Sequence, residues 1–180
     1  MNKIINFPNK KRDSFEKTLS EMMKEARFLE EKPIIKRGIY ISNLKELEKT
    51  IKKSIFDVLV KENCQNSDYF HCGQYISSLI KKTVDSPLES FYVIDYLAKI
   101  DSNEDFYNWQ KAADLCFLLC SVFTKRCDHG LMSYQTYLLI GKSLYSISYS
   151  KSRKKITYLM SNNYKTMVNV TQQALKTLSQ

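Results

Sequence analysis

The sequence has 180 residues, a net charge of +9, 43% hydrophobic and 26% charged residues, an ordinary composition for a globular protein that buries its own core. Only four glycines and three prolines occur, too few for the many tight turns that an all-β fold requires. The longest apolar stretch, Ala112 to Phe123, spans 12 residues, whereas a membrane-spanning helix needs about 20, so we expect no membrane span.

The predicted elements begin after a polar arm over residues 1–12, which ends in three basic residues and which we expect to be mobile. A first helix is predicted from Asp13, with apolar residues at helical spacing, and Pro33 ends it. The β-branched segment Ile34–Ile41 has no evident second strand to pair with, so we interpret it as an extended connector. We expect a single helical domain over residues 13–180.

Three further helices are predicted before residue 100. Ser42 or Asn43 begins the second helix, which is amphipathic and has one buried side. Ser67 is the predicted cap of the third helix, which runs to about residue 84. The segment Ser86-Pro87-Leu88-Glu89 combines a serine cap, a proline at the first helical position and a glutamate three residues after the cap, so it predicts the start of a fourth helix.

A helix over about 104–126 is apolar nearly all round in its second half, which is typical of a helix at the centre of a bundle. Residues 127–131 are a predicted turn, and Ser133 caps the next helix. A last helical region follows Ser150, and Asn162-Asn163 is a candidate break within it. The sequence therefore predicts an all-α fold, a compact bundle of six or seven helices around the 104–126 helix.

Charge is distributed unevenly along the chain. Residues 121–180 contain nine basic residues and one acidic residue, a balance of +8, whereas residues 85–110 contain six acidic residues and one basic residue. The strongest basic segment is Lys151-Ser152-Arg153-Lys154-Lys155, and Arg126 and Lys142 are candidates for the same surface. Such residues can bind phosphates, but no recognition-helix or RNA-module pattern is present. The basic third indicates either a solvated lysine-rich surface or an anion-binding one.

Asp114 is the first candidate for a functional residue, because a carboxylate in so apolar a helix must find a donor or take up a proton. The expected donors are Lys142, Tyr137, Tyr145 or helix N-terminal amides. Gly141 shares a helix face with both tyrosines, because the three residues are four apart, and we interpret it as a point of tight packing on the Asp114 helix. Asp114 is expected to be a buried structural group, with ligand binding as the alternative.

No other chemistry is indicated by the sequence. An odd number of cysteines, five, fits a reducing compartment better than a disulfide framework. The cysteines and histidines lack the usual spacing of zinc ligands, and neither a nucleophile–base motif nor a glycine-rich phosphate loop occurs. We therefore expect no metal, no cofactor and no enzymatic activity. Because the first residues lack a secretory signal, a cytoplasmic location is expected.

Three segments in the second half of the chain resemble a known family. They are Phe91-Tyr92 through Leu97, Asp114-Leu-Cys-Phe-Leu-Leu-Cys-Ser-Val-Phe123, and the helix with Ser133, Tyr137, Gly141 and Tyr145. On these segments, residues 90–178 resemble a family of uncharacterised helical bacterial proteins, although Ala113, Ser121 and Thr136 depart from its pattern. The resemblance implies a bacterial source and a unit built around Asp114 and the Gly141 helix, and it implies no activity.

The expected function follows from what helix-rich proteins without catalytic motifs most often do, which is to bind other macromolecules. We expect a cytoplasmic regulatory or adaptor protein that binds a protein partner, with a second copy of the chain as one candidate. One alternative is nucleic-acid binding through the basic C-terminal third. Another is a small-ligand binder or enzyme centred on Asp114.

Overall fold

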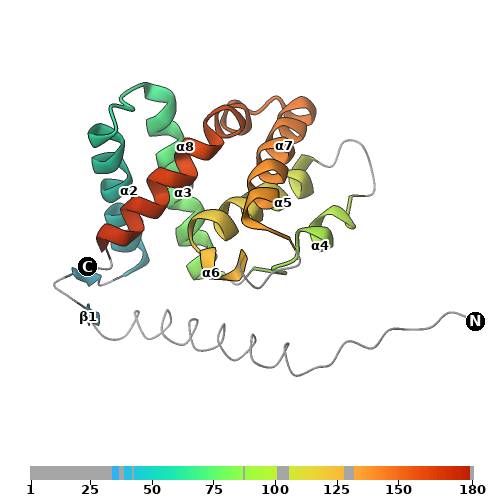
Figure 1. Ribbon diagram of the computed structural model, residues 1–180. Helices are drawn as coiled ribbons and strands as arrows, with labels where there is room; N and C mark the ends of the chain where they lie inside the picture. The colour runs from blue at the N-terminus through green and yellow to red at the C-terminus, as the bar shows by residue number, and fades with distance from the viewer. Residues whose placement is uncertain are drawn as a thin grey trace, which may run out of the picture.

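The computed structural model describes residues 34–36, 39–41, 43–86, 88–100, 106–127 and 132–178. These residues form seven helices, α2–α8, and one short hairpin, so the predicted all-α bundle is confirmed (Figure 1). The predicted N-terminal arm, the helix predicted from Asp13 and most of the turn predicted over 127–131 lie outside the described residues.

The segment from residue 34 to residue 41 is not the extended connector that the sequence predicted. Strand β1 (Ile34–Lys36) pairs antiparallel with strand β2 (Ile39–Ile41). The prediction was wrong because the partner strand lies within the segment itself, where β1 and β2 pair with each other.

The next two helices begin at asparagine caps. The Asn43 side chain accepts hydrogen bonds from the N–H groups of Lys45 and Glu46, both at 3.0 Å, and so starts α2 (Leu44–Lys61) as predicted. Asn66, rather than the predicted Ser67, caps α3 (Ser67–Asp85). The two helices pack against each other through their apolar sides.

The start signal at Ser86 does not begin a helix. Ser86 instead terminates α3, and the next helix, α4 (Val93–Leu97), has no side-chain cap. The Glu89 carboxylate, which would complete a capping box with Ser86, binds Lys99 and Lys111 instead. The glutamate of the local capping signal is therefore engaged by lysines 10 and 22 residues later in the chain.

Helix α5 (Phe106–Ser121) is the centre of the bundle, as predicted. Nine of its 16 residues are buried, including an unbroken run from Leu115 to its end, so no side of its second half faces water. The helix is shorter than predicted, because the N–H groups of Val122 and Phe123 both bond to the carbonyl of Leu118 and close the last turn. The single-turn helix α6 (Thr124–Cys127) follows, so the predicted helix over 104–126 is two helices.

The last two helices form the C-terminal half of the bundle. Ser133 caps α7 (Tyr134–Ser152) as predicted, by accepting the N–H of Thr136 at 3.2 Å. Helix α8 (Lys155–Leu178) continues through the candidate break at Asn162-Asn163. The Asn163 side chain donates to a carbonyl of its own helix at 3.0 Å, so it is accommodated without a break.

Helix α8 joins two helix pairs, α2 with α3 and α5 with α7, and contacts both (Figure 1). Two hydrogen bonds support this arrangement. The Ser54 hydroxyl of α2 donates to the Ala174 carbonyl at 3.0 Å, and the Gln172 amide of α8 donates to the Cys120 carbonyl of α5 at 2.7 Å. Helix α5 is thereby fixed with one side toward α7 and with Asp114 near α3.

Candidate functional site

Asp114 lies where α3, α5 and α7 meet, and one of its oxygens ties the three helices together. Its Oδ1 accepts hydrogen bonds from the Tyr145 hydroxyl of α7 at 2.5 Å and from the Tyr75 hydroxyl of α3 at 2.6 Å. The side-chain amide of Gln110, one turn earlier on α5, donates to the Tyr75 hydroxyl at 2.9 Å. The carboxylate therefore has its donors, as a charge in an apolar helix requires.

The environment of Asp114 shifts its titration toward higher pH. Burial raises the pKa of Asp114 to about 6, while the hydrogen bonds from Tyr145 and Tyr75 and the charge of Lys82 oppose that rise. Burial and the negative charge of Asp114 raise the pKa of both tyrosines well above the ordinary value. Both hydroxyls therefore keep their protons and act as donors, and Asp114 titrates at about pH 6.

A cavity of about 190 Å³ opens beside Asp114 between α3 and α5. It is smaller than the roughly 300 Å³ at which pockets for drug-sized ligands begin, so its size suits only a small molecule. Opposite charges lie on its walls, which are formed by Tyr75, Ser78, Leu79, Lys82, Tyr107, Gln110, Lys111 and Asp114.

The structure brings together only part of the polar site that the sequence predicted. Tyr145 is a donor to Asp114, as expected. Tyr137 is buried near the thiols of α5 and α6 instead, and Lys142 is exposed; neither is among the described donors to Asp114. Tyr75 and Gln110 were missed. Gln110 stands one turn from Asp114 and could have been noticed, but no sequence spacing relates Tyr75 to α5.

Gly141 is a point of close packing, as predicted. A Cβ atom there would lie 2.8 Å from the Cβ of Cys116, so α5 approaches the α7 backbone closely. The same Cβ would lie 2.0 Å from the hydroxyl oxygen of Tyr164 on α8. The glycine therefore also allows the close approach of α8. Its spacing from Tyr137 and Tyr145 did not indicate this second contact.

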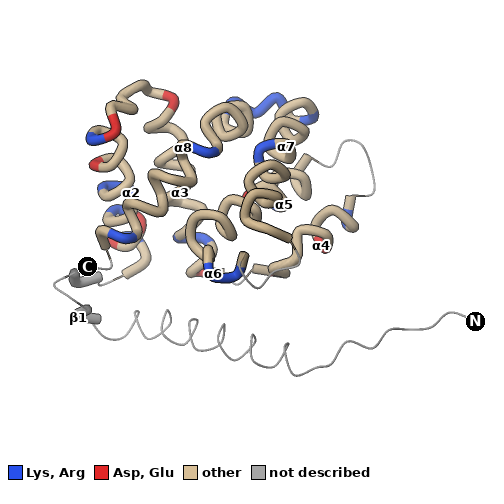
Figure 2. Tube along the Cα trace, viewed as in Figure 1, with Lys and Arg blue, Asp and Glu red and all other residues tan. Residues whose placement is uncertain are grey.

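The basic residues are divided between different parts of the surface (Figure 2). Lys151, Arg153, Lys154 and Lys155 are exposed where α7 ends and α8 begins, and we call these four residues the basic corner. Arg126 lies at the other end of α7, on α6. Lys142 precedes Lys151 by nine residues, about two and a half helical turns, and so lies on the opposite side of α7. Neither residue joins the basic corner.

Aromatic rings lie within the basic corner. Tyr149 and Tyr158 have ring centroids 5.1 Å apart, and the Arg153 guanidinium lies 5.6 Å from the Tyr149 ring. Lys154 Nζ lies 4.6 Å from the ring of Phe106 at the start of α5. These distances are those of cation–π contacts, which hold the two cations near the rings.

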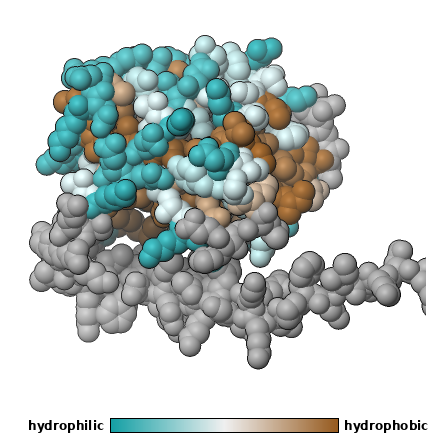
Figure 3. Space-filling model, viewed as in Figure 1, coloured by the Kyte–Doolittle hydropathy of each residue, from teal (hydrophilic) through white to brown (hydrophobic). Residues whose placement is uncertain are grey.

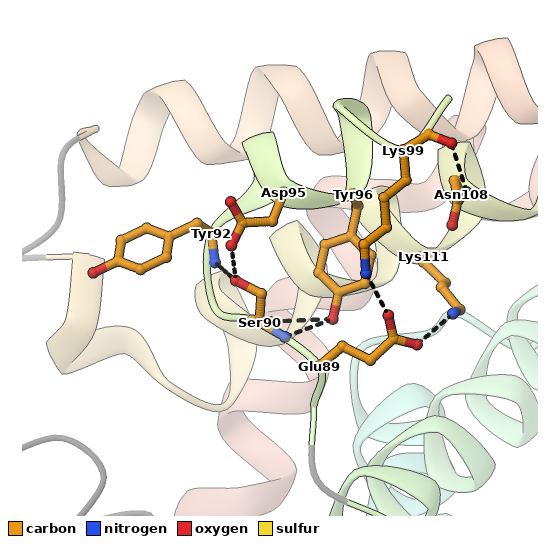
Figure 4. A network of polar contacts seen from close by, with 8 residues as sticks. All are labelled: Glu89, Ser90, Tyr92, Asp95, Tyr96, Lys99, Asn108 and Lys111. Atoms are coloured by element: carbon orange, nitrogen blue, oxygen red, sulfur yellow. Dashed lines mark hydrogen bonds and ion pairs between the residues drawn. The ribbon is translucent and has the colours of Figure 1, made fainter. Parts of the chain in front are cut away.

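Polar contacts fix the segment that carries α4 (Figure 4). The Glu89 carboxylate accepts hydrogen bonds from Lys111 at 2.7 Å and from Lys99 at 2.9 Å, and these two bonds lower the pKa of Glu89 to about 2. The Tyr96 hydroxyl donates to the Ser90 carbonyl at 3.1 Å and accepts from the Ser90 N–H at 3.2 Å. Both ends of the segment are thus bonded to each other and to α5.

All five cysteines belong to the described residues, and four of them are buried. None of the five thiols is in a disulfide, and burial raises the pKa of Cys72 and Cys116 to about 12, so these two remain protonated. Among the described residues, no three His, Cys, Asp or Glu side chains could together hold a metal ion. The imidazole of His71 lies 2.7 Å from the Ser67 carbonyl within the first turn of α3, and His129 lies outside the described residues.

Comparison with family models, with curated proteins and with solved structures gave no match to this chain. The resemblance of residues 90–178 to a bacterial family stays a prediction. Within the described part of the chain, every helix is too short or too polar to cross a membrane.

Proposed function

We propose that this protein is a regulatory or adaptor module that binds a protein partner through the surface of α4. The observation that carries this proposal is the exposure of two large apolar side chains on one short helix and its cap. Tyr92 is 58% exposed and Ile94 is 64% exposed. Apolar surface gathers on the side of the molecule where α4 lies (Figure 3). Gathered apolar surface favours a binding site, whereas single exposed residues are ordinary.

The rigidity of the segment supports the same proposal. Glu89, bonded to two lysines, and Tyr96, bonded to Ser90, fix the backbone on both sides of Tyr92, whose ring points away from this network (Figure 4). An exposed apolar pair on a fixed backbone loses little conformational entropy when a partner binds.

The residue types at this surface are those that contribute most to protein interfaces, where tyrosine and arginine are enriched. The guanidinium of Arg126 lies 4.7 Å from the ring of Phe91, next to Tyr92 in the chain. Partial burial lowers the pKa of Arg126. A partner at this surface would contact the apolar side chains of Tyr92 and Ile94 and, beside Phe91, the cation of Arg126.

Affinity purification from the native host tests the proposal, with nuclease-treated and untreated samples compared. The variant Tyr92→Ser/Ile94→Ser is compared with Val60→Ser, which removes an exposed apolar side chain from α2. We expect protein partners that survive nuclease, are retained by Val60→Ser and are lost from the double variant. If the double variant retains the same proteins, the α4 surface is not their binding site.

A second candidate function, nucleic-acid binding, is favoured by the basic corner and its tyrosines. Four consecutive or nearly consecutive cations beside the Tyr149 and Tyr158 rings could bind phosphates and stack bases. If all four cations contact phosphates of a single strand, log Kd should change with log salt with a slope near 3, about 0.7 per contact. Fluorescence anisotropy with labelled single-stranded RNA and DNA measures this slope. An unchanged slope in the variant Lys154→Gln/Lys155→Gln would exclude the basic corner as the nucleic-acid-binding site.

A further inference from the structure

No residue of α4 lines the cavity beside Asp114. We propose that this cavity binds a small zwitterion, whose cationic group bonds to Asp114 and whose anionic group is held by Lys82. The argument rests on which groups of the cavity wall already have partners, on the sign of the remaining charges and on the size of the cavity.

Asp114 keeps one acceptor free for a ligand. Both tyrosine hydrogen bonds go to Oδ1, and no described residue donates to Oδ2. Because Asp114 is part of the cavity wall, a cationic donor in the cavity can reach this carboxylate. An ammonium group would supply the counter-charge that a poorly solvated carboxylate lacks.

The two lysines of the cavity wall differ in their partners. Lys111 donates to Glu89 at 2.7 Å, so its charge is balanced. Lys82, on α3, makes no ion pair with any described residue, and its charge acts on Asp114. Lys82 is therefore the cation available to an anionic group of a ligand.

These charges select the class of ligand. A simple anion that reaches Lys82 also meets the negative charge of Asp114, and a simple cation that reaches Asp114 meets the positive charge of Lys82. Like charges brought close together oppose binding. A molecule that carries both charges at separate ends meets an opposite charge at each.

The size and rigidity of the cavity limit the ligand further. A volume of about 190 Å³ is below the roughly 300 Å³ at which pockets for drug-sized ligands begin, which suits a ligand of amino-acid size. Tyr75 is held by hydrogen bonds to both Asp114 and Gln110, so this side of the wall is ordered before binding. An ordered wall reduces the entropy that binding costs.

Titration of the ¹⁵N-labelled full-length protein, followed by NMR, tests the proposal. The probes are two zwitterions with different charge separations, norvaline and 5-aminopentanoate, and two singly charged molecules of the same chain length, pentylammonium and pentanoate. We expect at least one zwitterion to shift the backbone signal of Gln110 saturably, with a Kd about tenfold below that of either singly charged probe.

Two substitutions then test which charged residue binds each end of the zwitterion. Lys82→Met should raise the Kd of the bound zwitterion about tenfold, and Asp114→Asn should abolish saturable binding. Lys165→Met is the matched control, because Lys165 is exposed on α8, which contributes nothing to the cavity wall. The proposal is overturned if neither zwitterion binds, if a singly charged probe binds as tightly, or if Lys82→Met leaves the Kd unchanged. None of these variants alters Tyr92 or Ile94, so failure here is distinguishable from failure of the proposed adaptor function.

Discussion

Replacing Gly141 by alanine tests the packing of α5, α7 and α8 at one point. In an open helix this substitution stabilises by about 1 kcal/mol, because alanine has the higher helix propensity. Here the new Cβ would lie 2.0 Å from the Tyr164 hydroxyl oxygen, 2.5 Å from the Tyr164 Cζ and 2.8 Å from the Cys116 Cβ. All three distances are shorter than a normal contact, so helices or rings must move.

The surroundings of Tyr164 set the magnitude of this cost. Tyr164 is only 2% exposed, and the rings of Phe117 and Tyr145 lie against it with centroids 5.8 Å away. Inserting a methyl group into a packed core costs about 1–3 kcal/mol, and a ring enclosed in this way puts the cost at the upper end. After the gain in propensity, we expect Gly141→Ala to lower the free energy of unfolding by about 2 kcal/mol.

Urea unfolding followed by circular dichroism measures the effect, with Gly73→Ala as the matched control. A Cβ at Gly73 would lie 2.9 Å from the half-buried Phe56 ring and 3.0 Å from Cγ2 of the buried Ile55, both longer than the 2.0 Å at Gly141, so we expect a smaller loss of stability than for Gly141→Ala. Tyr164→Phe should recover part of the loss, because it removes the atom at 2.0 Å and because that buried hydroxyl has no hydrogen-bond partner among the described residues. A Gly141→Ala protein as stable as the wild type would refute the reasoning.

Three other substitutions give further predictions. Folding raises the pKa of Asp114 from 3.8 to about 6, so the stability of the wild type relative to Asp114→Asn should fall as pH rises through that range, as urea titrations near pH 4 and near pH 7 would measure. The contribution of Glu89 to stability depends on pH in the opposite direction. Folding lowers its pKa from 4.5 to about 2, so its advantage over Glu89→Gln, at most about 1 kcal/mol for such exposed pairs, should vanish as pH falls through that range in acid titrations. Gln172→Leu leaves the Cys120 carbonyl without its donor and should cost about 1 kcal/mol in urea unfolding.

The features that were predicted correctly depend on residues close together in sequence. Asn43 and Ser133 cap helices because the amides that they bind are two or three residues away. The buried run in α5 was evident because its residues are apolar on every side of the helix. Gly141 indicated close packing because glycine is costly within a helix unless space requires it.

The features that were missed depend on contacts between distant residues. Ser86 has every local mark of a helix cap, yet Glu89 is bound by Lys111, which follows it by 22 residues. Tyr75 is 39 residues from Asp114, and no periodicity links them. The position of Arg126 was also missed. It belongs to the same basic third of the sequence as the residues of the basic corner, but it lies on α6, at the opposite end of α7. Position on the surface follows from packing, which residue spacing alone does not determine.

Amide hydrogen exchange tests most directly the claim that α5 is the buried centre of the bundle, on which the Asp114 site and the α4 segment both rest. The amides from Leu115 to Ser121 should exchange most slowly of all, with a free energy equal to that of global unfolding, because no part of that run faces water. If those amides exchange as fast as the amides of the five-residue helix α4, α5 opens independently of the bundle and the account is wrong.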